Sequence, residues 1–188
     1  MLVQKFPLSL ANLSFITFNY DRCIGKYLLN YAAHTLFKSV EQVAGSVGEV
    51  PVLHPFGQLG ALEHLGALGS AEVRFGEDDP RYLWPAARGI KTFTEELDSA
   101  HGQRVRQQVD TARTVVFLGF QYHEPNMRIL FGETGLRGKR VFGTTFGMSD
   151  RRKLQLQGSL QNNGNTVTLA SMKCDAFIAQ YGEEIFES

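Results

Sequence analysis

Residues that could do chemistry follow the first two strand-like segments of the sequence: Thr17, Asn19, Asp21, His54 and Gly57. A carboxamide, an imidazole, a glycine turn and hydroxyl groups near one crevice suit the binding of a polar ligand that carries sugar and phosphate groups.

A second set of polar and glycine residues follows the later strand-like segments: Gly119, Phe120, Gln121, Thr144, Thr145 and residues 171–175, which include Cys174. A glycine at the end of a strand lets backbone amides approach a ligand closely. Hydroxyl groups and a glycine turn suit a ligand that carries sugar and phosphate groups.

Strand-like and helix-like segments alternate along the chain. The expected strands are residues 14–18, 50–53, 73–75, 114–118, 141–145 and 166–169, and the expected helices start at residues 22, 77, 94, 124, 149 and 174. This alternation predicts an α/β fold with a parallel sheet, in which ligands bind at the carboxyl ends of the strands. We expect both sets of residues to meet at that edge.

Two residues of the first set, Asp21 and Asn19, each allow two interpretations. Asp21 is placed to cap the helix of residues 22–38, and it could also contact a ligand. Asn19 could be a turn residue chosen for its local hydrogen bonds. Residues 45–49 are predicted to be a turn. Residues 58–76 are predicted to be a loop with a short helix, followed by the strand 73–75. In the helix that starts at residue 77, we expect Tyr82, Leu83 and Trp84 to form the buried face.

Composition bounds the class of protein. The 188 residues predict one domain with a sizeable core, and the 19 basic and 19 acidic residues balance, which indicates no nucleic-acid partner. No apolar run approaches the ~20 residues of a membrane span. Cys23 and Cys174 are expected to be reduced, which favours a cytoplasmic location. Two cysteines do not make a four-cysteine zinc site, and no metal site is predicted.

Three segments resemble motifs of the SIR2-like (sirtuin-related) NAD-binding family. Residues 17–21 (TFNYD) are similar to its T-x-N-Y-D motif, and residues 52–57 (VLHPFG) resemble the following strand end with His and Gly. Residues 116–126 (VFLGFQYHEPN) resemble its later F-L-G-(aromatic)-x-x-x-x-P-N signature. The three segments occur in the family's order.

This resemblance implies a Rossmann-like, sirtuin-type NAD-binding domain that cleaves the nicotinamide–ribose bond of NAD, as in SIR2-like proteins of bacterial anti-phage defence. It implies that Asn19 contacts the ribose or positions water and that His54 is the base. The implied contacts to NAD or an ADP-ribose-type nucleotide come from Thr17, Asp21, Gly57, Gly119, Phe120, Thr144 and Cys174.

Two departures from the family pattern open an alternative. Phe56 stands where catalytic sirtuins carry the base, and no segment matches the phosphate-binding G-A-G-x-S motif, so residues 1–188 are expected to be the C-terminal part of such a domain. An incomplete sheet would expose an edge and favour self-association. The alternative is a non-catalytic α/β module for nucleotide binding or protein interaction.

Overall fold

The computed structural model describes residues 10–65, 72–76, 78–87, 89–91, 100–133 and 135–186. The chain divides into two compact units, Met1–Gly102 and Gln103–Ser188, and each unit has its own parallel strands and its own apolar core. The single domain expected over residues 1–188 stays a prediction. Among the described residues, no helix has the length and apolar character needed to cross a membrane.

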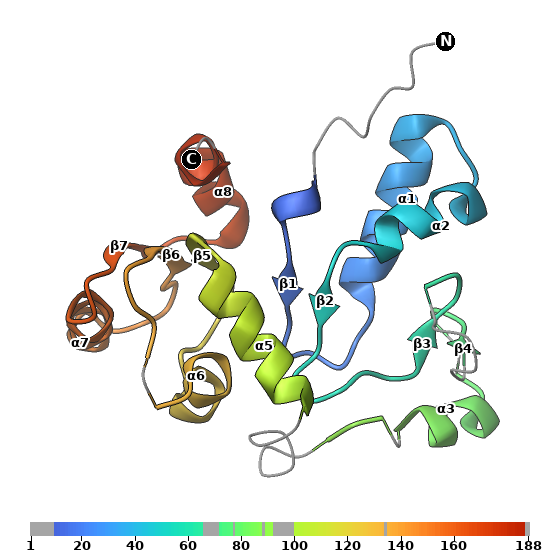
Figure 1. Ribbon diagram of the computed structural model, residues 1–188, viewed down its shortest axis with the longest axis horizontal. Coiled ribbons are helices and arrows are strands. Elements are labelled where there is room, and N and C mark those ends of the chain that lie inside the picture. The colour runs from blue at the N-terminus through green and yellow to red at the C-terminus, as the bar shows by residue number, and fades with distance from the viewer. Residues whose placement is uncertain are drawn as a thin grey trace. The chain divides into compact units, whose positions relative to one another are not determined.

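The first unit pairs short strands with two packed helices (Figure 1). Its elements are η1 (Leu10–Asn12), β1 (Phe15–Ile16), α1 (Cys23–Leu36), α2 (Val40–Gly48), β2 (Val52–Leu53), β3 (Ala61–Leu62), β4 (Glu72–Val73) and α3 (Pro80–Ala87).

Strand β1 runs parallel to β2, with Phe15 opposite Val52 and Ile16 opposite Leu53. The amide of Thr17 donates to the carbonyl of Leu53 at 2.9 Å, which extends the pairing beyond the strands. Strand β3 is likewise parallel to β4. Because parallel strands end at the same edge, the residues that follow β1 and β2 lie close to one another.

The core of the first unit lies between α1 and α2. Leu28, Leu29 and Ala32 recur at the spacing of one helix face and are buried against Val43 and Val47 of α2. A capping box starts α2: the Ser39 hydroxyl accepts from the amide of Gln42, and the side chain of Gln42 accepts from the amide of Ser39.

Some expectations for the first unit were wrong. Residues 45–48 are the last turn of α2, because the cap at Ser39 starts a helix that the glycines do not stop. Residues 58–76, expected to be a loop before the strand 73–75, contain the β3–β4 pair, and residues 66–71 lie outside the described residues. Tyr82 and Trp84 are exposed, and the buried residue of α3 is Ala86; the side chain of Leu83 lies outside the described residues.

The second unit is a three-stranded parallel sheet with helices. Helix α5 (Ala100–Thr111) begins just before the boundary between the units, and then follow β5 (Thr114–Phe117), α6 (Glu124–Phe131), β6 (Arg140–Thr144), α7 (Asp150–Gln161), β7 (Thr166–Ala170) and α8 (Cys174–Phe186). Residues 92–99, the start of the predicted helix 94–112, lie outside the described residues.

The strand order of this sheet is β5-β6-β7, and both pairs are parallel. Thr114 pairs with Arg140, which pairs with Thr166 on its other side. All three strands lie within one residue of their predicted ends, and α8 has the predicted bounds. The prediction of an α/β fold with parallel strands is therefore confirmed.

An aromatic cluster fixes the segment that follows β5. The ring centroids of Phe117 and Tyr122 are 5.2 Å apart, those of Phe120 and Tyr122 are 5.3 Å apart, and Phe131 packs edge-on against Phe117. On β6, Phe142 is buried with Phe177 of α8. Aromatic residues therefore supply both the core and the rigid support of the strand ends.

Gly143 makes room for the hydroxyl of Tyr122. A Cβ atom at Gly143 would lie 2.1 Å from that hydroxyl, which donates to the carbonyl of Thr144 at 3.3 Å. Burial raises the pKa of the Tyr122 phenol well above its usual range, so the group stays a hydrogen-bond donor.

We predict that Gly143→Ala destabilises the protein by about 2 kcal/mol or more, because the added methyl group overlaps the Tyr122 hydroxyl. Tyr122→Phe alone costs about 1 kcal/mol, the value of its hydrogen bond. In the double variant the hydroxyl is gone, so Gly143→Ala should cost less in the Tyr122→Phe background. Urea unfolding of the four proteins measures this coupling, and strictly additive losses would contradict the assigned contact.

Candidate functional site

The polar turn after β1 is built from short-range hydrogen bonds. The Thr17 hydroxyl accepts from the amide of Asn19 at 3.2 Å, and the Asp21 carboxylate accepts from the amide of Cys23 at 2.9 Å. Asp21 therefore satisfies the first amide of α1, as predicted, although Arg22 holds the N-cap position. Hydrogen bonding to Cys23 lowers the pKa of Asp21, with smaller contributions from His54 and Asn19. Contact of Asp21 with a ligand stays a prediction.

His54 is bonded to the same turn. Its side chain is 7% exposed, and its Nδ1 lies 3.0 Å from the backbone carbonyl of Asn19. A carbonyl only accepts, so Nδ1 carries the proton and the lone pair of the neutral ring is at Nε2. Nε2 has no hydrogen-bond partner among the described residues. This is the tautomer that a base acting through Nε2 requires.

Burial sets the charge of His54. It lowers the pKa of the imidazole, and this effect outweighs the Asn19 carbonyl and the Asp21 carboxylate, which both raise it. A ring with a pKa below its usual 6.5 is neutral at pH 7. His54 is therefore in the state that accepts a proton.

The turn from His54 to Gly57 explains why residue 57 is glycine. The His54 carbonyl accepts from the amide of Gly57 at 2.8 Å, and Nε2 of His101 lies 3.0 Å from the same oxygen. Gly57 has φ +76°, and a Cβ there would lie 1.8 Å from the carbonyl oxygen of Gly89. Backbone packing alone thus requires Gly57, and its role toward a cofactor stays a prediction.

Phe56, at the position where the SIR2-like motif carries a base, packs against Phe18. The two ring centroids are 5.6 Å apart and the rings meet edge-on at 69°. This aromatic pair joins the residues after β1 to those after β2, so packing accounts for Phe56 at this position.

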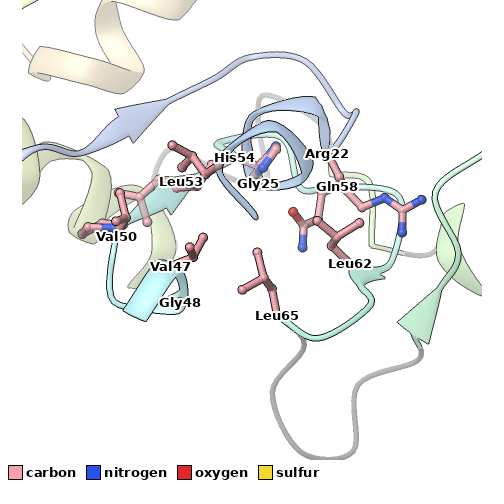
Figure 2. Close-up of a pocket in the computed structure, with 13 residues that line it drawn as sticks. Arg22, Gly25, Val47, Gly48, Val50, Leu53, His54, Gln58, Leu62 and Leu65 are labelled. Carbon is pink, nitrogen blue, oxygen red and sulfur yellow. The ribbon is translucent and has the colours of Figure 1, made fainter. Parts of the chain in front are cut away.

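His54 and Arg22 line a cavity of about 270 Å³ in the first unit. In Figure 2 the amide of Gln58 points into this cavity, and Val47 and Leu65 extend toward it from the opposite side. Asn19 and Asp21 do not line it. Most of the residues that line the cavity are apolar, but Arg22, His54 and Gln58 give it a substantial polar surface.

Arg22 is a residue whose role the sequence did not reveal. Its guanidinium donates to the carbonyls of Ala61, Val73 and Arg74, and burial lowers its pKa. It therefore ties the start of α1 to the β3–β4 pair. A cation at a helix N-terminus is electrostatically unfavourable. The position of Arg22 directly before α1 could therefore have indicated, from the sequence, that another segment binds its guanidinium.

In the second unit, Gly119, Phe120, Thr144 and Cys174 line one cavity of about 470 Å³ at the carboxyl ends of the strands. The Thr144 hydroxyl accepts from the amide of Gly119 at 2.9 Å, so this amide is used inside the protein. The predicted residues after β5, β6 and β7 therefore do meet, and their contact with a cofactor stays a prediction.

Two basic residues that line this cavity, Arg152 and Lys173, were not predicted from the sequence as site residues. Arg152 lies in the first turn of α7, and Lys173 directly precedes α8; both line the cavity. The first turns of helices that follow parallel strands lie at the ligand-binding edge, so their position was the available signal. The two sets of site residues belong to different units: 17–57 to the first and 119–174 to the second.

No protein-family model matches this chain, and no curated protein or solved structure matches it. The three sequence motifs and the geometry within each of the two units are therefore the features that indicate a function.

We predict that Gly57→Ala destabilises the protein by about 2 kcal/mol or more, because φ is positive and the methyl group meets a backbone oxygen that has no side-chain freedom. The matched control is Gly45→Ala. Gly45 lies in α2 with nothing within 4 Å of the added carbon, so this change should stabilise by about 0.5 kcal/mol. Urea unfolding measures both, and equal effects would refute the assignment.

We predict that His54 makes stability depend on pH. The pKa is lowered in the folded state, so below about 6.5 the unfolded chain binds more protons, and stability falls as the pH drops toward the folded pKa. The free energy of unfolding of the wild type should therefore fall more steeply from about pH 8 to about pH 5 than that of His54→Gln. Parallel curves would show that His54 is not buried as a neutral ring.

Proposed function

We propose that this chain is a SIR2-like NAD-binding protein that hydrolyses NAD at the nicotinamide–ribose bond. The observation that carries the proposal is the 3.0 Å contact between Nδ1 of His54 and the carbonyl of Asn19, which leaves Nε2 of a neutral ring as a base. The resemblance of residues 17–21 to T-x-N-Y-D gives the substrate class.

The fold supports this proposal at the level of architecture. Parallel strands with helical connections place polar residues at the carboxyl edge, where α/β proteins bind nucleotides. A sirtuin-type, Rossmann-like domain would bind NAD at the carboxyl ends of its strands. In the second unit, Gly119, Phe120, Thr144 and Cys174 would be nucleotide contacts. In the first unit, Thr17, Asp21 and Gly57 would be contacts near Asn19 and His54.

In the proposed reaction, water attacks the anomeric carbon of the nicotinamide ribose. A C–O bond forms, the C–N bond breaks, and nicotinamide leaves as a neutral molecule with the bonding electron pair. Nε2 of His54 takes the proton of the water and later releases it to solvent, so the products are nicotinamide, ADP-ribose and a proton. The Asn19 carboxamide positions the water or the ribose.

One observation favours a second candidate, a non-catalytic nucleotide-binding or protein-interaction module. Phe56 occupies the place of the family's base and is packed against Phe18, so this position cannot transfer a proton. In such a protein the Asn19–His54 contact would serve only to brace the two strand ends. Binding of a nucleotide without its cleavage would identify this candidate.

The test is nicotinamide release from NAD, followed by liquid chromatography. Wild-type protein should release nicotinamide, and His54→Gln should slow release about 100-fold or more, the typical contribution of a general base. Asn19→Ala should also slow it; because the backbone carbonyl that holds His54 remains, this variant isolates the carboxamide.

The matched control is His34→Gln, which changes an exposed histidine of α1 and should leave the rate unchanged. No release by the wild type, or equal release by wild type, His54→Gln and Asn19→Ala, would refute the enzymatic proposal. In that case, calorimetry with NAD and ADP-ribose distinguishes a nucleotide-binding module from a protein-interaction module.

A further inference from the structure

The cavity of the second unit is lined by cationic, hydroxyl and aromatic side chains that take no part in the proposed bond cleavage. It opens at the carboxyl ends of β5, β6 and β7, and the chain segments that follow each of these strands line it. Its volume is about 470 Å³. Every residue that lines the cavity belongs to the second unit, so this unit by itself forms the cavity.

The charged side chains that line this cavity are both cations. Arg152 and Lys173 are exposed, and neither forms an ion pair with a described residue. Arg152 donates through Nη2 to the carbonyl of Gln121 at 3.0 Å, which leaves other N–H groups of the guanidinium for a ligand. Two uncompensated cations favour an anionic ligand, and a guanidinium fits a phosphate especially well.

A buried hydroxyl at the same cavity lacks a partner. Thr145 is 2% exposed and lines the cavity, and its Oγ1 has no hydrogen-bond partner in the described part of the chain. Its neighbour Thr144 differs, since its hydroxyl accepts from the amide of Gly119. An unpaired buried hydroxyl costs stability, and a ligand oxygen in the cavity would give it a partner.

An exposed aromatic ring stands beside these polar groups. Phe146 is 66% exposed and lines the cavity, and it lies in a turn in which the amide of Met148 donates to the carbonyl of Thr145 at 3.0 Å. Gly147 has φ +76° at the third position of this turn, as a type II turn requires. The turn thus holds a flat apolar ring in solvent, where a nucleobase could stack on it.

We propose that this cavity binds a nucleotide by its phosphates, through Arg152 and Lys173, with the base against Phe146. The helices that begin at Asp150 and Cys174 start at this edge, and their N-terminal amides favour the same negative charge. This inference deepens the proposed function, since it assigns the phosphate contacts of an ADP-ribose-type ligand to two side chains of α7 and the α8 start.

The test is isothermal titration calorimetry on the full chain with ADP, adenosine and inorganic pyrophosphate. ADP should bind at least about tenfold more tightly than adenosine at low salt, and the difference should shrink at high salt because the phosphate contacts are screened. ADP should also bind more tightly than pyrophosphate, since pyrophosphate cannot stack on Phe146. Equal affinity for ADP and adenosine, tighter binding of pyrophosphate than of ADP, or no ADP binding would overturn the proposal.

Variants distinguish the specific effect of the two cavity cations from the effect of removing one positive charge elsewhere on the protein. Lys173→Gln and Arg152→Gln should each weaken ADP binding about fivefold and leave adenosine binding unchanged. The matched control is Arg151→Gln, which removes the same charge from an exposed neighbour outside the cavity and should leave ADP binding unchanged. The side chain of Lys173 has no hydrogen bond or ion pair with a described residue, and its backbone carbonyl, which accepts from the amide of Phe177, is unchanged in the variant, so Lys173→Gln tests the site without removing an internal contact. Equal affinities of all three variants would overturn the proposal.

This outcome is independent of NAD cleavage. ADP binding that depends on Arg152 and Lys173 without nicotinamide release would leave the phosphate site intact and refute the reaction. Nicotinamide release together with unchanged ADP affinity in the Lys173 and Arg152 variants would support the reaction and refute the phosphate site.

Discussion

Hydrogen bonds between parallel strands are the constraint on which both candidate sites depend. In the first unit, the register that sets Phe15 opposite Val52 makes β1 and β2 end together, so the carbonyl of Asn19 reaches the ring of His54. In the second unit, three strands in register end around one cavity. A shift of one residue in either pairing would turn alternate side chains to the other face and separate these groups.

Close backbone packing fixes the shape of the strand ends more strictly than the polar contacts do. Gly57 and Gly143 each stand where a Cβ atom would overlap a neighbouring oxygen, a backbone carbonyl in one case and the Tyr122 hydroxyl in the other. Neither glycine needs a ligand to explain it. This packing holds His54 and the segment after β5 in place, and rigid support of this kind is what a binding or catalytic site needs.

The two units differ in the chemistry they present. The first offers a neutral imidazole with a fixed tautomer, and Arg22, the cation that lines its cavity, donates to three carbonyl groups. The second offers two cations that form no ion pair with a described residue, and an exposed aromatic ring. The group suited to proton transfer and the groups suited to anion binding thus lie in different units.

Periodicity and local capping signals were enough to predict the α/β class, the three strands of the second unit and the bounds of α8, because these elements are fixed by their own sequence. Short-range contacts such as the bond from Asp21 to the start of α1 could be predicted for the same reason. The helix at residues 45–48, the β3–β4 pair and the exposure of Trp84 could not, since they depend on which distant segments pack together. Only the tertiary structure decided the tautomer of His54, the commitment of Arg22 and the placement of Arg152 and Lys173 beside Thr145. Each of these depends on a partner or a neighbour far away in the sequence, and a pattern along the chain cannot specify such a partner.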